Sequence, residues 1–210
     1  MKSEIINMSR QELVNALKDG KITICVVGLG RIGLPTAALF ADAGAQVVGV
    51  DTNFEVVRDV NAGKCRFEDE PGLDRLVKSC SKLGRLRGEV DFAAAVKKAD
   101  IIIICVPTPV NENRTPDYSA IIDASENVGR ALRKGSLVII ESTVGIGAVE
   151  KIIVPLLEKY SGMKAGKDFG VASCPERANP GDILRSMRTV PRILGGINFR
   201  STEVAARIYK

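Results

Sequence analysis

Histidine and tryptophan are both absent from the 210-residue sequence. Because histidine is the commonest general base and the commonest metal ligand, any catalysis must use other side chains. The three tyrosines and six phenylalanines are too few for a surface on which nucleobases stack. Lysine and arginine outnumber aspartate and glutamate by 30 to 25, but they alternate with the acidic residues and form no basic tract. We therefore expect no nucleic acid as a partner, and the basic excess suits a small anionic ligand at least as well.

Cysteine spacing and the length of apolar runs exclude further classes of protein. The five cysteines form no CxxC pair and show no metal-like spacing, so we expect buried reduced thiols and no metal site. No apolar run approaches the roughly 20 residues that a membrane span needs. The N-terminal segment is amphipathic and charged where a signal peptide is apolar. The sequence therefore predicts a cytoplasmic protein with no membrane association.

Strand-like and helix-like segments alternate along the chain, which is typical of an α/β protein. With 45% hydrophobic and 26% charged residues, the composition fits one large globular domain with room for a small second element. Strands are expected at residues 21–28, 46–51, 100–107, 136–142 and 169–175, with residues 86–91 as a weak candidate for the third strand. Helices are expected at residues 9–18, 33–44, 54–63, 73–84, 92–99, 118–135 and 148–160.

The expected strands are apolar on both faces and are separated by helices. This pattern predicts a doubly wound, mostly parallel sheet with helices on each face, which is a Rossmann-like fold. We expect residues 21–200 to form this domain, residues 1–20 a helical extension, and residues 201–210 the start of a truncated central helix. Ligands of such sheets bind at the carboxyl ends of the strands. The loops of interest are therefore those that follow Val27, Val50, Val106, Glu141 and Ser173.

The first of these loops, in the stretch ICVVGLGRIGLP, has three glycines at the spacing of a dinucleotide-binding turn. Gly28 permits the tight turn, Gly30 leaves room for a diphosphate, and Gly33 lets the helix approach the strand. Free N–H groups at the helix N-terminus favour the anion. Asp51, which ends the next strand, is placed to bind an adenosine ribose and to repel a 2′-phosphate, so the pattern predicts NAD in preference to NADP. The glycines alone are also compatible with FAD, another nucleotide or a simple packing turn.

Arg31 lies between the second and third glycines and has two candidate roles. Its guanidinium either donates to the diphosphate or lies in solvent. A cation beside a helix N-terminus is electrostatically unfavourable until an anion arrives. The sequence does not decide between these roles.

Seven short motifs resemble one known family. They are GLGRIGLP, VGVD, EPGL, VPTP, ESTV, CPERANPG and RILGG, in that family's order and at about its spacing. Together they extend over nearly the whole chain from Ile22, and the ordered set resembles the nucleotide-sugar 6-dehydrogenases of the UDP-glucose/GDP-mannose dehydrogenase family. The sequence PER followed by PG is most similar to the UDP-N-acetylmannosamine branch and its N-acetylglucosamine relatives.

The resemblance implies which residues contact the cofactor. Arg31 and Ile32 in the glycine turn, with Asp51, Thr108 and Thr143, are the implied contacts for NAD. Arg31 stands where the family usually has tyrosine. Thr108 and Thr143 each follow an apolar strand, where a hydroxyl can bind ribose, the carboxamide or a catalytic water, or can simply cap a turn.

The resemblance also implies residues on the substrate side. Arg177 and Ala178 are the implied contacts for the sugar nucleotide, and Glu176 matches the family's carboxylate near the reacting carbon. Such a carboxylate can orient or deprotonate water, whereas the residues alone equally describe an exposed glutamate paired with Arg177. Cys174 is not assigned as a nucleophile, because it is not at the family's catalytic position and a thiol before proline at a strand end is more often packed.

Members of the family oxidise the C6 alcohol of a nucleotide sugar to a carboxylate, with two NAD and a covalent thioester on a cysteine. The implied ligands are NAD and a UDP-sugar, with UDP-N-acetyl-D-mannosamine favoured. Because the catalytic cysteine belongs to segments beyond the matched region, the chain is expected to be the N-terminal half of a longer, homo-oligomeric enzyme and to bind NAD without turning over. Family members commonly pair through a central helix, which is expected to begin near Thr202 and to leave an apolar stripe exposed.

Two other functions remain compatible with the sequence. One is a hydroxy-acid dehydrogenase of the 6-phosphogluconate type, which shares the glycine turn but needs a downstream lysine and asparagine helix instead of a nucleophilic cysteine. The other is a non-catalytic nucleotide-sensing module, for which the same half-site is complete in itself. The gene sequence downstream of this segment distinguishes the three.

Overall fold

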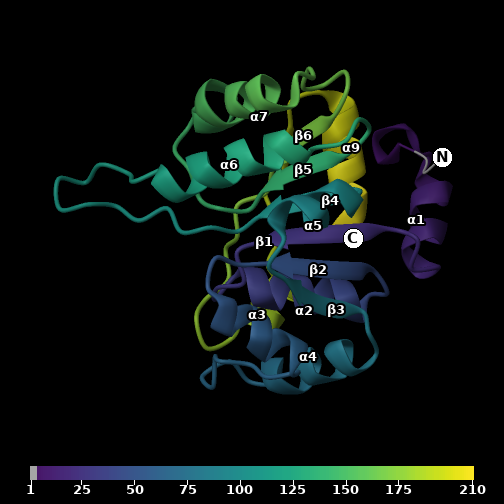
Figure 1. Cartoon of the computed structure of the whole chain (residues 1–210), viewed down its shortest axis with the longest axis vertical. Coiled ribbons are helices and arrows are strands. Elements are labelled where there is room, and N and C mark those ends of the chain that lie inside the picture. The colour runs from purple at the N-terminus through teal and green to yellow at the C-terminus, as the bar shows by residue number, and fades with distance from the viewer. Residues whose placement is uncertain (1–3) are drawn as a thin grey trace.

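The computed structural model describes residues 4–210, whose strands form one seven-stranded sheet in the order β3-β2-β1-β4-β5-β6-β7 (Figure 1). The first six strands are parallel, and β7 pairs antiparallel with β6. Their bounds are β1 (Thr23–Val27), β2 (Gln46–Val50), β3 (Leu86–Glu89), β4 (Ile101–Ile104), β5 (Leu137–Ile140), β6 (Gly170–Ser173) and β7 (Gly195–Gly196). The strand order reverses between β1 and β4, which is the point where sheets of this kind bind ligands.

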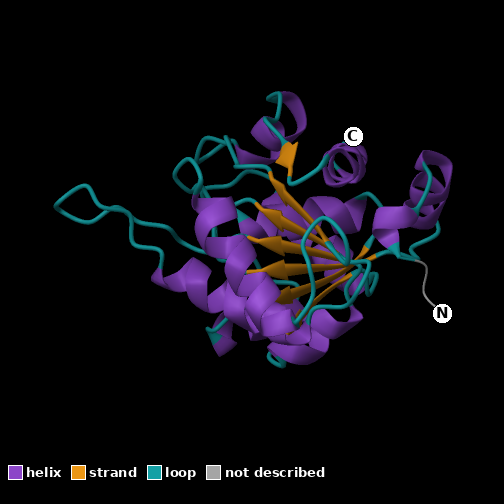
Figure 2. Cartoon of the chain, turned by 90° about the horizontal axis from the view of Figure 1, so that it is seen from above, coloured by secondary structure: helices purple, strands orange, loops and turns teal. Residues whose placement is uncertain are grey.

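Helices cover both faces of the sheet (Figure 2). The core on one face takes side chains from α1, α2, α4 and α9, and the core on the other from α5, α6 and α7. The helical bounds are η1 (Ile5–Asn7), α1 (Arg10–Lys18), α2 (Gly33–Asp42), α3 (Phe54–Asn61), α4 (Leu73–Lys82), α5 (Phe92–Lys98), α6 (Ser119–Ala131), η2 (Val149–Ile153), α7 (Val154–Ser161), α8 (Ile183–Thr189) and α9 (Phe199–Ile208). The predicted doubly wound fold is confirmed. In the described part of the chain, no helix is both long and apolar enough to span a membrane.

Successive residues of the central strands enter different halves of the core. Ile101 and Ile103 of β4 pack on the face that α2 covers, whereas Ile102 and Ile104 pack on the face that α6 covers. All four side chains are fully buried. A strand buried on both faces has no polar positions, which is why β4 appears in the sequence as an unbroken apolar run.

Some elements differ from the sequence pattern. The weak candidate for the third strand is real, because β3 pairs in parallel with β2. The pattern does not predict β7 or α8, since β7 consists of two glycines and α8 follows a polar loop. The helix expected at residues 148–160 begins as the π-helix η2, which gives way to α7 next to Pro155, a residue without an N–H to donate.

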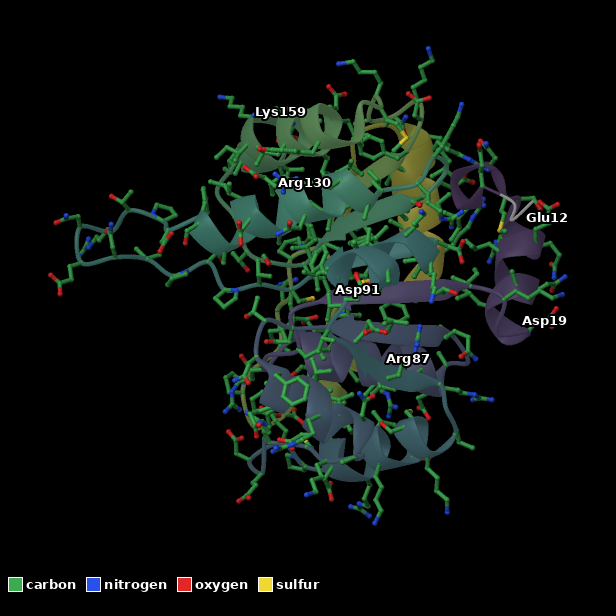
Figure 3. All side chains as sticks on the ribbon, in the orientation of Figure 1. Glu12, Asp19, Arg87, Asp91, Arg130 and Lys159 are labelled. Carbon is green, nitrogen blue, oxygen red and sulfur yellow. The ribbon has the colours of Figure 1, made fainter. Side chains whose placement is uncertain are left out.

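The loop between β4 and α6 projects far from the body of the molecule (Figure 1). Its two sides are joined by the bridge between Val110 and Pro116 and by a 3.0 Å hydrogen bond from the Asn111 N–H to the Thr115 carbonyl. Residues 110–117 are all exposed, and Figure 3 shows the side chains of this loop pointing away from the domain. Thr108 lies at the base of the loop, close to the sheet edge.

The last helix, α9, packs onto the same sheet. It begins at Phe199, where the Asn198 side chain accepts a hydrogen bond from the Ser201 N–H at 2.8 Å. Val204 and Ala205 are fully buried on the sheet. The helix therefore starts before Thr202, and the expected exposed apolar stripe is wrong, because the domain itself covers that face of the helix.

Arg200 of α9 holds the N-terminal segment, since its Nε and Nη2 donate to the carbonyls of Ile6 and Met8 at 2.5 and 2.7 Å. We expect Arg200→Met to lower the free energy of unfolding by about 1–2 kcal/mol, because two charge-assisted hydrogen bonds are lost. Limited proteolysis should then cleave residues 4–20 faster. The control is Arg207→Met, which removes a guanidinium paired with Glu203 inside α9. Equal cleavage rates in the two variants would contradict the role of Arg200.

Candidate functional site

The glycine turn joins β1 to α2 under tight steric constraint. Gly28 has a φ of +90°, and a Cβ on it would lie 2.6 Å from the carbonyl oxygen of Cys105. A Cβ on Gly33 would lie 1.8 Å from the carbonyl oxygen of Gly28. No atom lies within 4 Å of a Cβ placed on Gly30. The fold therefore requires two of the three glycines, and the third leaves the space over the turn open.

Backbone donors gather at the start of α2. Among residues 4–210, no protein acceptor is found for the N–H groups of Gly30, Arg31 and Ile32. The side chain of Ile32, meanwhile, packs against the core beneath the turn. Unpaired amides at a helix N-terminus, together with the helix dipole, form a site for an anion.

Asp51 ties the end of β2 to the glycine turn. Its Oδ2 accepts the Leu29 N–H at 2.8 Å, and its Oδ1 accepts the Asn53 N–H at 2.9 Å. The side chain is only partly buried, and each carboxylate oxygen has a second lone pair for another donor. The carboxylate therefore has a structural role that the sequence pattern does not reveal, and it still has capacity for a ribose hydroxyl.

The side chain of Arg31 does not extend freely into solvent, and its guanidinium is directed away from the amides of the turn toward two acidic residues. Its Nη1 lies 2.7 Å from Asp69 Oδ2 and 3.1 Å from Glu70 Oε1. The guanidinium carbon lies 5.1 Å from the ring centroid of Phe67. The hydrogen bond from Arg31 lowers the pKa of Asp69. The acidic loop between α3 and α4 thus neutralises the cation that the sequence places beside the helix N-terminus.

Thr108 and Thr143 meet at the carboxyl edge of the sheet. The Thr108 hydroxyl donates to the Thr143 carbonyl at 2.7 Å, which joins the loops after β4 and β5. The side chain of Thr143 is exposed. The structure therefore brings together the two threonines that the sequence singles out, and it leaves the Thr143 hydroxyl accessible from solvent.

Glu176 lies in the loop after β6 and is mostly buried, with 8% of its side chain exposed. Its Oε2 lies 2.9 Å from Nη1 of Arg192. The side chain of Arg177 does not pair with it, because the Arg177 Nη1 donates to the Pro191 carbonyl at 3.0 Å. The alternative of an exposed glutamate paired with Arg177 is therefore wrong. Ala178, the next residue in this loop, is half-buried.

Glu141, which directly follows β5, is a buried carboxylate that the sequence analysis missed. It accepts hydrogen bonds from four side chains: Thr36 at 2.9 Å, Cys105 at 3.1 Å, Arg192 at 3.2 Å and Tyr209 at 2.9 Å. Burial raises the pKa of Glu141, and the positive charge of Arg192 opposes that rise. The available signal in the sequence is a charged residue that directly ends a run of four apolar strand residues.

A chain of polar contacts joins the start of α2 to Glu176. Thr36 in the first turn of α2 bonds to Glu141, and Nη1 of Arg192 bridges Glu141 and Glu176. Arg192 also lies over the ring of Tyr209, with its guanidinium carbon 4.6 Å from the ring centroid. The loops after β5 and β6 are therefore held by one shared cation.

The buried cysteines near this edge are poor nucleophiles. Burial raises the pKa of the Cys174 thiol, and Arg192, whose Nη1 lies 3.9 Å from the sulfur, offsets only part of that rise. Burial also raises the pKa of Cys105, and it raises that of Cys25 to about 12. Because the thiolate is the reactive form, these side chains act as packed residues.

Comparison with known proteins gives the family. The sequence profile of the UDP-glucose/GDP-mannose dehydrogenase family, NAD binding domain, matches residues 22–210. The chain belongs to this family. The matched region is the NAD-binding domain, and the cofactor of the domain is therefore NAD.

Several relatives of this NAD-binding domain are bacterial or archaeal enzymes. The chain is 40% identical over 187 residues to UDP-N-acetyl-D-mannosamine dehydrogenase of Pyrococcus horikoshii, and the match covers 89% of the chain and 44% of the relative. The same-named protein of Campylobacter jejuni is 40% identical over 194 residues, with 89% and 46% covered. The chain thus spans less than half the length of these curated relatives.

Solved structures agree with the sequence comparison. The UDP-D-ManNAc dehydrogenase structure from P. horikoshii has a TM-score of 0.85 at 39% identity, and covers 90% of this chain and 44% of that one. A ternary complex of GDP-mannose dehydrogenase from Pseudomonas aeruginosa has a TM-score of 0.85 at 33% identity, with 89% and 43% covered.

The residues present fit a dinucleotide. The open space over Gly30, the unpaired amides of the turn and the partly exposed carboxylate of Asp51 are the groups that a diphosphate and a ribose need. We propose that Gly28, Gly30, Arg31, Ile32 and Gly33 form the diphosphate side of the site. Asp51 would hold the ribose, and Thr108 and Thr143 would face the remainder of the cofactor.

Two glycine variants separate folding from binding. We expect Gly33→Ala to destabilise the domain by on the order of 3 kcal/mol or more, because its Cβ meets backbone. Gly30→Ala should change the free energy of unfolding by less than about 0.5 kcal/mol. It should nevertheless weaken NAD binding roughly tenfold or more, since a methyl group enters the space over the turn. Urea denaturation and calorimetric titration measure the two effects, and unchanged NAD affinity in Gly30→Ala would place the diphosphate elsewhere.

Asp51→Asn tests the ribose contact. Losing the charge should weaken NAD binding by roughly tenfold, because a charge-assisted hydrogen bond becomes neutral. It should also narrow the difference in affinity between NAD and NADP, because repulsion of the 2′-phosphate disappears. Asp19→Asn removes an equal charge from an exposed pair with Lys21 and serves as control. If discrimination between the cofactors is unchanged, Asp51 does not face the ribose.

Proposed function

We propose that the chain is the NAD-binding part of a nucleotide-sugar 6-dehydrogenase that oxidises UDP-N-acetyl-D-mannosamine to the uronate with two NAD. The observation that supports this most is the 40% identity, over 89% of the chain, to UDP-N-acetyl-D-mannosamine dehydrogenases. The position of Glu176 also supports it. The loop that contains Glu176 leaves the same sheet edge as the glycine turn, so an oxidised carbon and a cofactor can meet there.

The proposed chemistry divides between cofactor and protein. NAD supplies a hydride acceptor when bound. Glu176 orients or deprotonates the water that the oxidation to a carboxylate requires. Arg192 fixes the position of that carboxylate through the 2.9 Å contact. Thr143, with an exposed side chain at the same edge, is the second proposed catalytic residue and positions the water or the cofactor.

The substrate would lie against the loop after β6. The guanidinium of Arg177 uses Nη1 on the Pro191 carbonyl, and its remaining N–H donors suit the diphosphate of a nucleotide sugar. Ala178 follows it in the half-buried part of the loop, where a small side chain leaves room for a sugar. We assign both residues to binding of the sugar nucleotide.

The remaining parts of the proposal concern the longer protein. The chain covers 44% and 46% of two relatives, which supports placing the nucleophilic cysteine in the other part of the enzyme. We propose that this whole enzyme is a cytoplasmic homo-oligomer. The family match favours this function over a hydroxy-acid dehydrogenase, since the matched profile is that of the UDP-glucose/GDP-mannose dehydrogenase family.

Calorimetry and an NADH assay on the 210-residue chain test the proposal. We expect NAD to bind more tightly than NADP, and we expect no NADH with UDP-N-acetyl-D-mannosamine, because the nucleophile lies outside this part. The full-length gene product should form two NADH per UDP-N-acetyl-D-mannosamine and none with 6-phosphogluconate. Turnover by the 210-residue chain alone would contradict the assigned division of the enzyme. Turnover of 6-phosphogluconate by the full-length product would contradict the substrate.

A further inference from the structure

Glu70 is a buried carboxylate between α3 and α4 that neither the glycine motif nor the proposed chemistry uses. Only 1% of its side chain is exposed. Its Oε1 accepts from Arg31 Nη1 at 3.1 Å and from the Gly181 N–H at 2.8 Å, and its Oε2 accepts from the Ile183 N–H at 3.1 Å. A carboxyl group at this depth is tolerated because three donors satisfy it.

These donors come from two regions that are remote in sequence. Arg31 belongs to the glycine turn, whereas Gly181 and Ile183 belong to the end of the loop that begins with Glu176 and runs into α8. The side chain of Asp182, the residue before α8, makes no capping hydrogen bond. Glu70 therefore supplies, from another part of the chain, the anion that a helix N-terminus favours.

We infer that Glu70 is a positioning residue through which NAD bound at the glycine turn fixes residues 176–183, the segment that presents Glu176 and Arg177 to the substrate. The inference rests on the proposed cofactor site at the turn. It goes further by joining that site to the substrate side through one side chain.

The coupling follows from how Arg31 is placed. Its Nη1 makes both carboxylate contacts, and among the described residues Nε and Nη2 have no protein acceptor. A guanidinium has five N–H donors in a fixed plane, so it can serve a diphosphate without releasing Glu70. A diphosphate bound at the turn also adds negative charge near the buried carboxylate of Glu70. The positive charge of Arg31 beside Glu70 is then more strongly stabilising. An immobilised Arg31 holds Glu70, and Glu70 holds the amides of Gly181 and Ile183.

Amide hydrogen exchange, measured by NMR on the 210-residue chain with and without saturating NAD, tests this coupling. In the wild type we expect NAD to slow exchange at Gly181 and Ile183 by roughly tenfold, a factor typical of coupling between sites. Arg31→Met removes the guanidinium of the Arg31–Glu70 contact, and Glu70→Gln removes the charge of its carboxylate. At saturating NAD, each variant should abolish the NAD-dependent slowing of exchange at Gly181 and Ile183. Arg31 is partly exposed, so its replacement leaves the core intact.

Asp69→Asn is the matched control. Asp69 is the other carboxylate on Arg31, but its side chain is 59% exposed and accepts no hydrogen bond from the described loop of Gly181. It should keep the NAD-dependent slowing. If NAD shifts the signals of Gly28 to Gly33 but leaves Gly181 and Ile183 unchanged, the coupling is refuted while the cofactor site stands. If NAD shifts neither set, both fail. Loss of slowing in Asp69→Asn equal to that in Glu70→Gln would also refute the specific role of Glu70.

Discussion

The close approach of α2 to the end of β1 is the constraint on which the rest of this edge depends. The strand turns directly into the helix, and residue 33 therefore lies so close to the carbonyl of Gly28 that any side chain there would collide with it. That turn exposes the amides of Gly30, Arg31 and Ile32. It also fixes two neighbours: Asp51 reaches the Leu29 N–H just inside the turn, and Arg31 is directed toward the acidic loop. The proposed anion site and the contacts around it thus have one steric origin.

The cations at this edge already have acidic partners, whereas the amides of the glycine turn have no acceptor among the described residues. Arg31 is paired with Asp69 and Glu70, and Arg192 is shared between Glu141 and Glu176. A buried carboxylate is costly unless it is satisfied, and Glu70 and Glu141 each accept hydrogen bonds from more than one loop or helix. These carboxylates therefore restrict the movement of the loops, because a loop that moves away leaves a buried charge without its partner.

The sequence predicts the features that are local and misses those that need tertiary contacts. The apolar runs of β4 and β5, the glycine turn and the acid after β2 are each read from adjacent residues. The partner of Glu176 is not, because Arg192 comes 16 residues later, after a helix that the pattern does not show. The contacts of Arg31 span 38 and 39 residues. The strand β7 has two glycines and no side-chain pattern at all.

The relative strength of its contacts explains why Arg31 rests where it does. An exposed ion pair, such as that with Asp69, contributes little in water, and the stacking on Phe67 is also weak at an exposed site. The contact with Glu70 differs, because that carboxylate is shielded from water and has no other cationic partner among the described residues. Burial of one partner makes the interaction stronger and less sensitive to salt. Glu70 therefore decides the position of Arg31, while Phe67 supplies the flat surface against which the guanidinium lies.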